Sequence, residues 1–331
     1  MDMRLSQNHC FLCGEELTKN SGEELTKYSD EHLFPKWLQN KFNLWDQTIT
    51  LLNGTKIPYR MVKIPCCNTC NSEHLSQLEN EISKAVDGGY DSFIQLDQDK
   101  IFYWAAKILY GLFFKELSLN IDRRDPMAGT IMSPETMEKF QTLHMLLQGI
   151  RFPTQYVPVK PYSIFIFKMY EYGDEDWDES NFNYFDSYFS TVFGMKMNDI
   201  GFILCIEDSG VQSEFGKNYF DKYKDKTLHP IQLKEIYAKI NYKQLLAIYP
   251  PRYINIKTDN ERIVQVNQPS GDVFEDWSQE LYARGLAHIW SAYPNLRFED
   301  IYFPPDQVMS YLNNEDGSFN QLPKHILKKI K

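Results

Sequence analysis

Cys10-Phe11-Leu12-Cys13 and Cys66-Cys67-Asn68-Thr69-Cys70 are the two stretches that decide how the first part of this chain folds. Each contains two cysteines separated by two residues, a spacing that lets both sulfurs reach one metal ion. Together they supply four thiolates, the ligand number of a tetrahedral structural zinc site. Cys66 offers an alternative partner for Cys70, and Cys67 is preferred because its gap matches that of the first pair. The predicted Zn²⁺ ligands are Cys10, Cys13, Cys67 and Cys70.

The six cysteines are unevenly distributed, with five in these two stretches and Cys205 alone in an apolar segment. A disulfide framework would spread its cysteines more widely, so the clustering indicates reduced thiols in a reducing compartment. The N-terminus lacks the apolar stretch of a signal peptide, and no apolar run approaches the roughly 18 residues that span a bilayer. We therefore expect a cytoplasmic protein with no membrane partner.

Length and charge set further limits. The chain has 331 residues, of which 43% are hydrophobic, enough for a sizeable core and, by length, for two domains. Its formal net charge of -10 taken alone argues against nonspecific binding to a polyanion. The acidic excess lies mainly downstream, as in Asp174-Glu175-Asp176-Trp177-Asp178-Glu179, whereas the first 86 residues are nearly balanced. An eight-residue unit, GEELTKNS at 14–21 and GEELTKYS at 22–29, indicates a duplication in a surface loop.

Turn residues and hydrophobic periodicity predict an α+β fold. Asn53-Gly54 between short apolar runs predicts a hairpin over 49–57, and Leu75, Leu78, Ile82 and Ala85 continue from the second cysteine stretch at helical spacing. Residues 87–92 are interpreted as a break. The other predicted elements are helices over 100–119, from Ser133-Pro134 onward, over 231–248 and over 274–291, and strands over 162–170, 188–197 and 201–206. We predict an N-terminal zinc module at 1–88 and a larger α+β domain at 89–331.

The insertion between the two cysteine pairs carries the residues with chemical potential. About fifty residues separate the pairs, against roughly 15–20 in an ordinary zinc ribbon. Glu31-His32 lies inside this insertion, and Asn71 directly follows the last cysteine. Carboxylate and amide oxygens bind hard divalent cations, and an imidazole can take a proton from water. These types suit a metal-dependent phosphodiester hydrolase. Basic residues available for phosphate contacts are Lys36, Lys41, Lys56, Arg60 and Lys63.

The succession C-x-x-C, Glu-His-x-x-Pro and C-x-x-C-Asn resembles the zinc-containing branch of the HNH nuclease family, over residues 8 to about 85. The resemblance implies a ββα-metal fold related to treble-clef zinc fingers. It also implies that His32 is the general base and that Glu31 and Asn71 hold one catalytic Mg²⁺ or Mn²⁺. The implied activity is that of an endonuclease on double-stranded DNA. His74, three residues after Asn71, is an additional candidate for metal or phosphate contact, and an ordinary surface histidine is the alternative.

Other interpretations stay open at this point. His32 alone is compatible with a loop histidine, and Asn71 with a helix cap, where Asn is favoured whatever its role. HNH nucleases often carry Asn nine residues before the helix ligand, where this chain has Val62. The alternative function is therefore a catalytically degenerate module that only binds nucleic acid or protein. Residues 89–331 carry no chemical motif, and targeting, homodimerisation or binding of a controlling protein is expected there, consistent with bacterial defence against phage.

Overall fold

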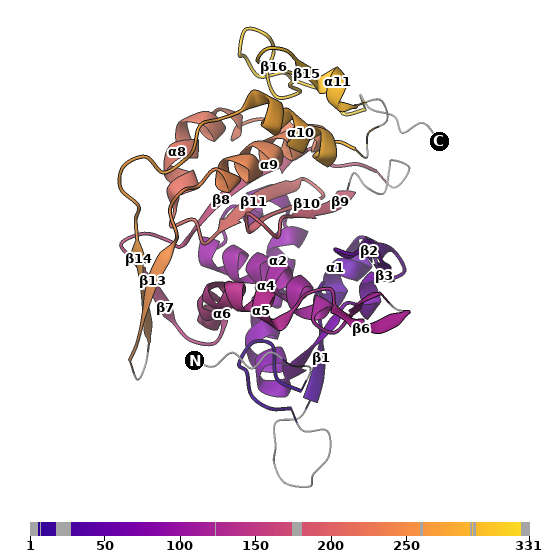
Figure 1. Cartoon of the computed structure of the whole chain (residues 1–331), viewed down its shortest axis with the longest axis vertical. Helices are drawn as coiled ribbons and strands as arrows, with labels where there is room; N and C mark the ends of the chain where they lie inside the picture. The colour runs from indigo at the N-terminus through magenta and orange to yellow at the C-terminus, as the bar shows by residue number, and fades with distance from the viewer. Residues whose placement is uncertain are drawn as a thin grey trace. The chain divides into compact units, whose positions relative to one another are not determined.

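The computed structural model describes residues 6, 8–17, 28–122, 124–173, 181–258, 261–291, 293 and 296–325 (Figure 1). The chain combines helices and strands, as the predicted α+β class requires. It divides into two compact units: unit 1 holds 1–88, 95–155 and 254–265, and unit 2 holds 89–94, 156–253 and 266–331. The predicted division into domains after residue 88 stays a prediction. Most of the duplicated eight-residue unit and the acidic run at 174–179 lie outside the described residues.

Unit 1 contains three short antiparallel strand pairs and several helices. Its strands pair as β1-β4, β2-β3 and β5-β6. Its elements are β1 (Tyr28–His32), α1 (Lys36–Lys41), β2 (Thr48–Thr50), β3 (Lys56–Pro58), β4 (Lys63–Cys67), the π-helix η2 (Cys70–Leu75), α2 (Ser76–Asp87), α4 (Gln98–Glu116), β5 (Asn120–Asp122), β6 (Asp125–Thr130), α5 (Pro134–Met137) and α6 (Gln141–Leu147). Three single turns of 3-10 helix complete it at Tyr59–Met61, Glu138–Phe140 and Gln148–Ile150.

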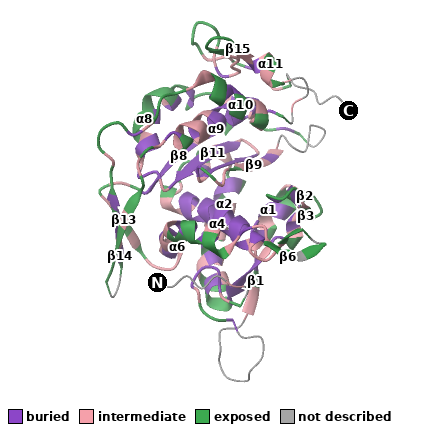
Figure 2. Ribbon diagram, viewed as in Figure 1, coloured by how far each residue is buried: buried purple, intermediate pink, exposed green. Residues whose placement is uncertain are grey.

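Helix α4 forms the centre of unit 1. Asp97 caps its first turn by accepting a hydrogen bond from the Asp99 amide, and every residue from Ile101 to Phe114 is buried (Figure 2). A helix that is apolar on all sides has to be enclosed, and α4 packs against α2, α6 and β4. A Cβ on Gly111 would lie 2.2 Å from Leu33 Cδ1. Glycine at this position therefore lets α4 approach the segment that follows β1.

Unit 2 is built on a five-stranded sheet in the order β12-β8-β11-β10-β9. β12 is parallel to β8, and the other neighbours are antiparallel. The strands are β8 (Tyr162–Met169), β9 (Phe182–Asp186), β10 (Val192–Met197), β11 (Ile200–Ile206) and β12 (Thr227–Leu228). All residues of β10 and β11, the two strands inside this order next to β8 and β9, are buried.

Helices cover this sheet. α8 (Val211–Phe220) packs against β8, α9 (Pro230–Leu245) packs against β10 and β11, and α10 (Gln279–Ile289) packs against α9 (Figure 1). One core cluster joins alternate residues of the strands, such as Phe165 and Phe167, to Leu233 and Ile236 of α9. A second cluster joins α9 and α10 around Trp290. The remaining elements are α3 (Gly89–Phe93), the 3-10 turn Asp221–Tyr223, α11 (Phe298–Ile301), β15 (Tyr302–Phe303) and β16 (Gln307–Val308).

A further three-stranded sheet has the order β13-β14-β7, with β7 at Thr154–Val157, β13 at Arg252–Lys257 and β14 at Arg262–Asn267. Among the described residues, no helix has the length and apolar character needed to cross a membrane.

Most predicted elements are confirmed, and four need correction. The hairpin at Asn53-Gly54 is β2-β3, with Gly54 at φ 77°, and the Ser133 hydroxyl accepts from the Thr136 amide as a cap. The break at 87–92 is wrong in part, because Gly89 at φ 72° turns the chain directly into α3. The helix after Pro134 is interrupted by 3-10 turns. α10 begins only at Gln279 and β10 only at Val192, and β9 is an additional strand that was not predicted.

Candidate functional site

Four of the five clustered cysteines come together in the fold. The Sγ atoms of Cys10, Cys13, Cys67 and Cys70 all lie within 4.8 Å of one another, and all four residues are buried. The Cys13 and Cys67 sulfurs are 3.7 Å apart. Four sulfurs at about 2.3 Å from a tetrahedral zinc would be about 3.8 Å from one another, so the site fits this ion. The predicted four-cysteine site is therefore present as a cluster that could bind a metal such as zinc.

Local geometry explains how each pair forms its half of the cluster. Gly14 at φ 75° donates its amide to the Cys10 carbonyl and closes the first turn at 2.9 Å. In the second pair the Cys70 amide lies 3.4 Å from the Cys67 sulfur. The Phe11 amide donates to the Pro65 carbonyl at 3.0 Å and ties the two stretches together. The two cysteine pairs flank the long insertion in the sequence. Each forms a tight turn, and the backbone hydrogen bond between Phe11 and Pro65 holds the two turns together.

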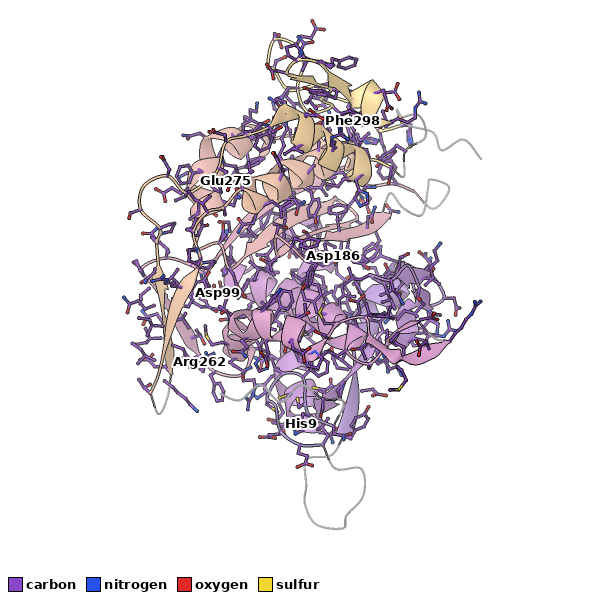
Figure 3. The ribbon with its side chains drawn as sticks, in the orientation of Figure 1. His9, Asp99, Asp186, Arg262, Glu275 and Phe298 are labelled. Carbon is purple, nitrogen blue, oxygen red and sulfur yellow. The ribbon has the colours of Figure 1, made fainter. Side chains whose placement is uncertain are left out.

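Neighbouring candidates stay outside this cluster. Cys66 Sγ is 3.9 Å from Cys10 Sγ, but Cys66 does not belong to the four-sulfur group, which agrees with the choice of Cys67. His9 lies beside Cys10 in unit 1 (Figure 3), and its Nδ1 is 2.6 Å from the Ser6 hydroxyl. His9 is therefore a neighbour of the cluster and not a member of it.

Two residues of α6 and its end support the first cysteine turn. His144 Nε2 lies 3.1 Å from the Phe11 carbonyl and 3.0 Å from the Leu12 carbonyl. Gln148 Nε2 donates to the same Leu12 carbonyl at 2.7 Å. Burial lowers the pKa of His144, so its ring is neutral at pH 7. The Phe11 and Leu12 carbonyls, which lie between the ligands Cys10 and Cys13, are thereby oriented by buried side chains, as is common around metal sites.

Strand β1 carries both Glu31 and His32, but with different surroundings. In the antiparallel register with β4, Glu31 is opposite Ile64 and His32 is opposite Lys63. Side chains alternate along a strand, so Ser29 and Glu31 share one face and His32 lies on the other. Asn71, in the first turn of η2, donates its side-chain amide to the Ser29 hydroxyl at 2.5 Å. Asn71 and Glu31 are therefore next to the same face of β1.

Glu31 is engaged by a buried lysine that sequence reasoning missed. Lys107 Nζ of α4 lies 2.7 Å from a Glu31 carboxylate oxygen and 2.6 Å from a Glu79 carboxylate oxygen, and the Lys107 side chain is 0% exposed. Burial alone would lower the pKa of Lys107, but Glu31 and Glu79 raise it above its ordinary value. Burial raises the pKa of Glu79 to about 7. The three side chains form a carboxylate–lysine cluster with one ammonium between two carboxylates.

A signal for this cluster exists in the sequence. Lys107 is the single charged residue between Ile101 and Phe114. A charge inside a helix that is apolar all round needs a buried partner of opposite sign. The partner's identity is not encoded locally, because Glu31 and Glu79 are 76 and 28 residues away along the chain.

His32 is half-buried and packs against an aromatic ring. Its ring is stacked on Trp45 with the centroids 6.0 Å apart. Its Nε2 is buried and has no hydrogen-bond partner among the described residues. Burial lowers the pKa of His32, and the charges of Lys63 and Lys36 lower it further. A neutral imidazole at pH 7 can accept a proton, which is the property a general base requires.

The backbone supports the loop that follows His32. The Leu33 amide donates to the Val62 carbonyl at 3.0 Å, and the Val62 amide donates to the Tyr59 carbonyl at 3.0 Å. Val62, where HNH nucleases often carry Asn, is thus buried and supplies its carbonyl oxygen to the residue next to His32. The Asn53 side chain donates to the Ile121 carbonyl and not to the loop that follows His32.

Asn71 and His74 both lie in the π-helical turn η2. The Ser76 amide bonds to the Asn71 carbonyl, five residues back, which defines this wider turn. Such turns occur frequently at functional sites. His74 is half-buried in the same turn and is not part of the four-cysteine cluster.

No family model, curated protein or solved structure matches this chain. Its function has to be inferred from the site itself.

Proposed function

We propose that unit 1 contains a zinc-stabilised, treble-clef-like ββα module that hydrolyses phosphodiester bonds of DNA, as the resemblance to HNH nucleases implies. The observation that carries the proposal is the position of the four-cysteine cluster. Cys70 begins η2, and Asn71 directly after it contacts Ser29 of the strand that carries Glu31 and His32. A zinc held by four thiolates has no open coordination position, so its role there is to hold the helix and strands in register.

His32 is the proposed general base. Its lowered pKa leaves the ring neutral at pH 7, the protonation state in which it can take a proton from the attacking water. Lys36 and Lys63 contribute positive charge close to His32, where a DNA phosphate would be attracted. His32 of β1 would thus act as the base, and Lys36 of α1 and Lys63 of β4 would attract the phosphate.

Glu31 and Asn71 are the proposed ligands of a catalytic Mg²⁺ or Mn²⁺, whose charge would stabilise the phosphate and the leaving oxygen. In the present arrangement they do not fit a divalent cation. Glu31 is in contact with the Lys107 ammonium, and the Asn71 amide is bonded to Ser29. The proposed role of Glu31 therefore depends on a rearrangement that separates it from Lys107.

The Glu31–Lys107 ion pair also favours a second function, in which the same module binds nucleic acid without cleaving it. An ammonium between Glu31 and Glu79 satisfies both carboxylates without any metal. In this alternative, zinc and the lysine would give a rigid platform, and Lys36 and Lys63 would contact phosphates. DNA as substrate, a homodimer or a controlling protein partner acting through residues 89–331, and a role in defence against phage remain proposals of the same kind.

The deciding experiment is nicking of supercoiled plasmid by the full chain in Mg²⁺ or Mn²⁺. We expect the wild type to nick the plasmid and His32→Ala to lose at least about 100-fold in rate, because general-base catalysis contributes roughly 10²–10⁴. Zinc content should be unchanged in this variant. His288→Ala, in an exposed position of α10, is the matched histidine control and should keep wild-type activity. Undiminished nicking by His32→Ala would remove His32 from the mechanism, and a wild type that binds duplex DNA without nicking it would establish the second function.

A further inference from the structure

Unit 2 contains a cleft of about 1030 Å³ that the proposed nuclease does not use. Its walls come from α8, α9, α10 with the segment before it, and residues 303–315 (Figure 1). This volume is at the upper end of the range of small-molecule sites, roughly 300–1,000 Å³. The cleft lies within one compact unit, so its shape follows from the packing of that unit alone.

The floor of the cleft is a fixed polar network. Glu235 of α9 is fully buried and accepts hydrogen bonds from the Ser310 hydroxyl and the Tyr311 amide, both at 2.7 Å. Lys239, one turn further, lies 3.0 Å from Glu235 and donates to the Tyr219 hydroxyl at 2.8 Å. The charge of Glu235 is thereby balanced inside the protein, and segment 310–312 is attached to α9. The cleft is preformed.

Exposed aromatic rings line the walls of the cleft. Phe215, Tyr219, Trp277 and Phe303 have exposed fractions between 36% and 58%. The Trp277 ring is held in place, because its Nε1 donates to Gln279 and its centroid lies 5.0 Å from that of Tyr282. Four large exposed rings around one cleft provide faces on which a flat ligand can stack.

Two polar groups of the lining lack a partner that would satisfy them among the residues that the structure describes. The Tyr282 hydroxyl has no hydrogen-bond partner there, although Tyr282 is only 3% exposed. The Lys243 ammonium lies 4.1 Å from the centre of the Phe274 ring, and no carboxylate of the described residues forms an ion pair with it. The half-buried ammonium gains from an acceptor that carries negative charge, whereas the Tyr282 hydroxyl has almost no exposed surface and is out of reach of a ligand in the cleft.

We propose that this cleft binds a small molecule with a planar aromatic ring and one anionic group, the chemistry of a nucleoside monophosphate or an aromatic carboxylate. The ring would stack against Trp277 and its neighbours, and the anion would lie near Lys243. Asp306 and Glu315 are exposed residues of the same lining, and their negative charges repel a second negative group. The ligand therefore carries a single anionic group and not a polyphosphate chain.

The test is calorimetric titration of the full chain with adenosine monophosphate, and separately with adenosine, ribose 5-phosphate and indole-3-acetate. We expect adenosine monophosphate to bind at least about tenfold more tightly than adenosine or ribose 5-phosphate, since the first lacks the anion and the second lacks the ring. Tighter binding of indole-3-acetate than of adenosine monophosphate would support the same chemistry with a carboxylate as its source.

Variants connect the binding to the cleft. Lys243→Gln and Trp277→Ala should each weaken binding at least about tenfold. Lys217→Gln changes an exposed lysine of α8 outside the cleft and should leave affinity unchanged. Circular dichroism checks that each variant is folded. Lack of binding by every probe at millimolar concentration, or equal affinity in wild type, Lys243→Gln and Trp277→Ala, would overturn the proposal and leave the nuclease proposal untouched.

Discussion

The four-cysteine cluster and the carboxylate–lysine cluster of unit 1 differ in how the charge of their buried side chains is balanced. Both gather acidic side chains that are far apart in the sequence and remove them from water. The cysteine cluster consists of four sulfur ligand atoms within 4.8 Å of one another. The carboxylate–lysine cluster already contains the Lys107 ammonium, bonded to both Glu31 and Glu79.

The four cysteines therefore require a metal ion to balance their charge, whereas Glu31 and Glu79 do not. Buried thiolates need a cation to offset their charge, and zinc supplies it together with directional bonds. Glu31 and Glu79 obtain much of the same compensation from Lys107, because a paired and hydrogen-bonded charge can remain buried. The four cysteines are arranged to receive an ion without displacing a side chain, whereas Glu31 is paired with Lys107 and its role as a metal ligand stays a prediction.

The largest expected effect comes from removing one sulfur ligand. Cys67→Ser should lose the zinc and leave unit 1 largely unfolded, because zinc binding supplies on the order of 10–16 kcal/mol of folding free energy in small zinc peptides. Cys66→Ala is the matched control, since Cys66 is equally buried but is not a member of the four-sulfur group. It should keep the zinc and lose only about 1–2 kcal/mol. Equal zinc loss in both variants, measured by metal analysis with circular dichroism, would show that the ligand set is wrong.

A smaller effect is expected at the carboxylate–lysine cluster. Lys107→Met keeps most of the side-chain volume but leaves Glu31 and Glu79 without their cation, which should cost about 3–5 kcal/mol in the free energy of unfolding at pH 7. Lys100→Met removes the partly exposed pair with Glu81 and should cost less than about 1 kcal/mol. Urea denaturation measures both. Similar losses in the two variants would mean that Lys107 does not compensate the buried carboxylates.

Asp208 of unit 2 extends the comparison to a buried carboxylate held mainly by neutral donors. It accepts hydrogen bonds from the Gly210 and Gln212 amides, and burial nevertheless raises its pKa to about 6. Since the folded state holds this proton more tightly than the unfolded state, the contribution of Asp208 to stability is present below about pH 4. It falls as the pH rises to 6, by up to about 1.4 kcal/mol per pH unit.

Asp208→Asn should abolish this part of the pH dependence. The free energy of unfolding, measured from pH 4 to 7, should fall more steeply with rising pH in the wild type than in the variant. Parallel curves for the two proteins would contradict the raised pKa and show that the amide donors alone satisfy the carboxylate.

Sequence alone was sufficient where structure is determined by neighbours in the chain. The C-x-x-C turns, the Asn53-Gly54 hairpin and the Ser133 cap depend on backbone geometry within a few residues, and all three were predicted. The apolar helix α4 was also predicted, because its length and composition leave few alternatives.

The contacts between distant elements could not be predicted in the same way. Glu31 was interpreted as a metal ligand because its neighbours in the sequence suggest one, whereas its environment is set by Lys107 of α4. His144 and Gln148 reach the first cysteine turn from more than 130 residues away. β9, with only Phe182 buried, lacks the apolar run that marked β10 and β11. Long-range packing decides each of these cases, and one sequence holds no direct record of it.

Metal analysis of the purified full chain, after dialysis against buffer with equal low concentrations of Zn²⁺ and Mn²⁺ followed by metal-free buffer, tests this comparison most directly. We expect one zinc per chain, retained at the four cysteines, and well below one manganese in the chain without DNA, because Lys107 occupies Glu31 until the proposed rearrangement separates them. A wild-type chain without zinc, or one that retains a full equivalent of manganese beside its zinc, would contradict the account.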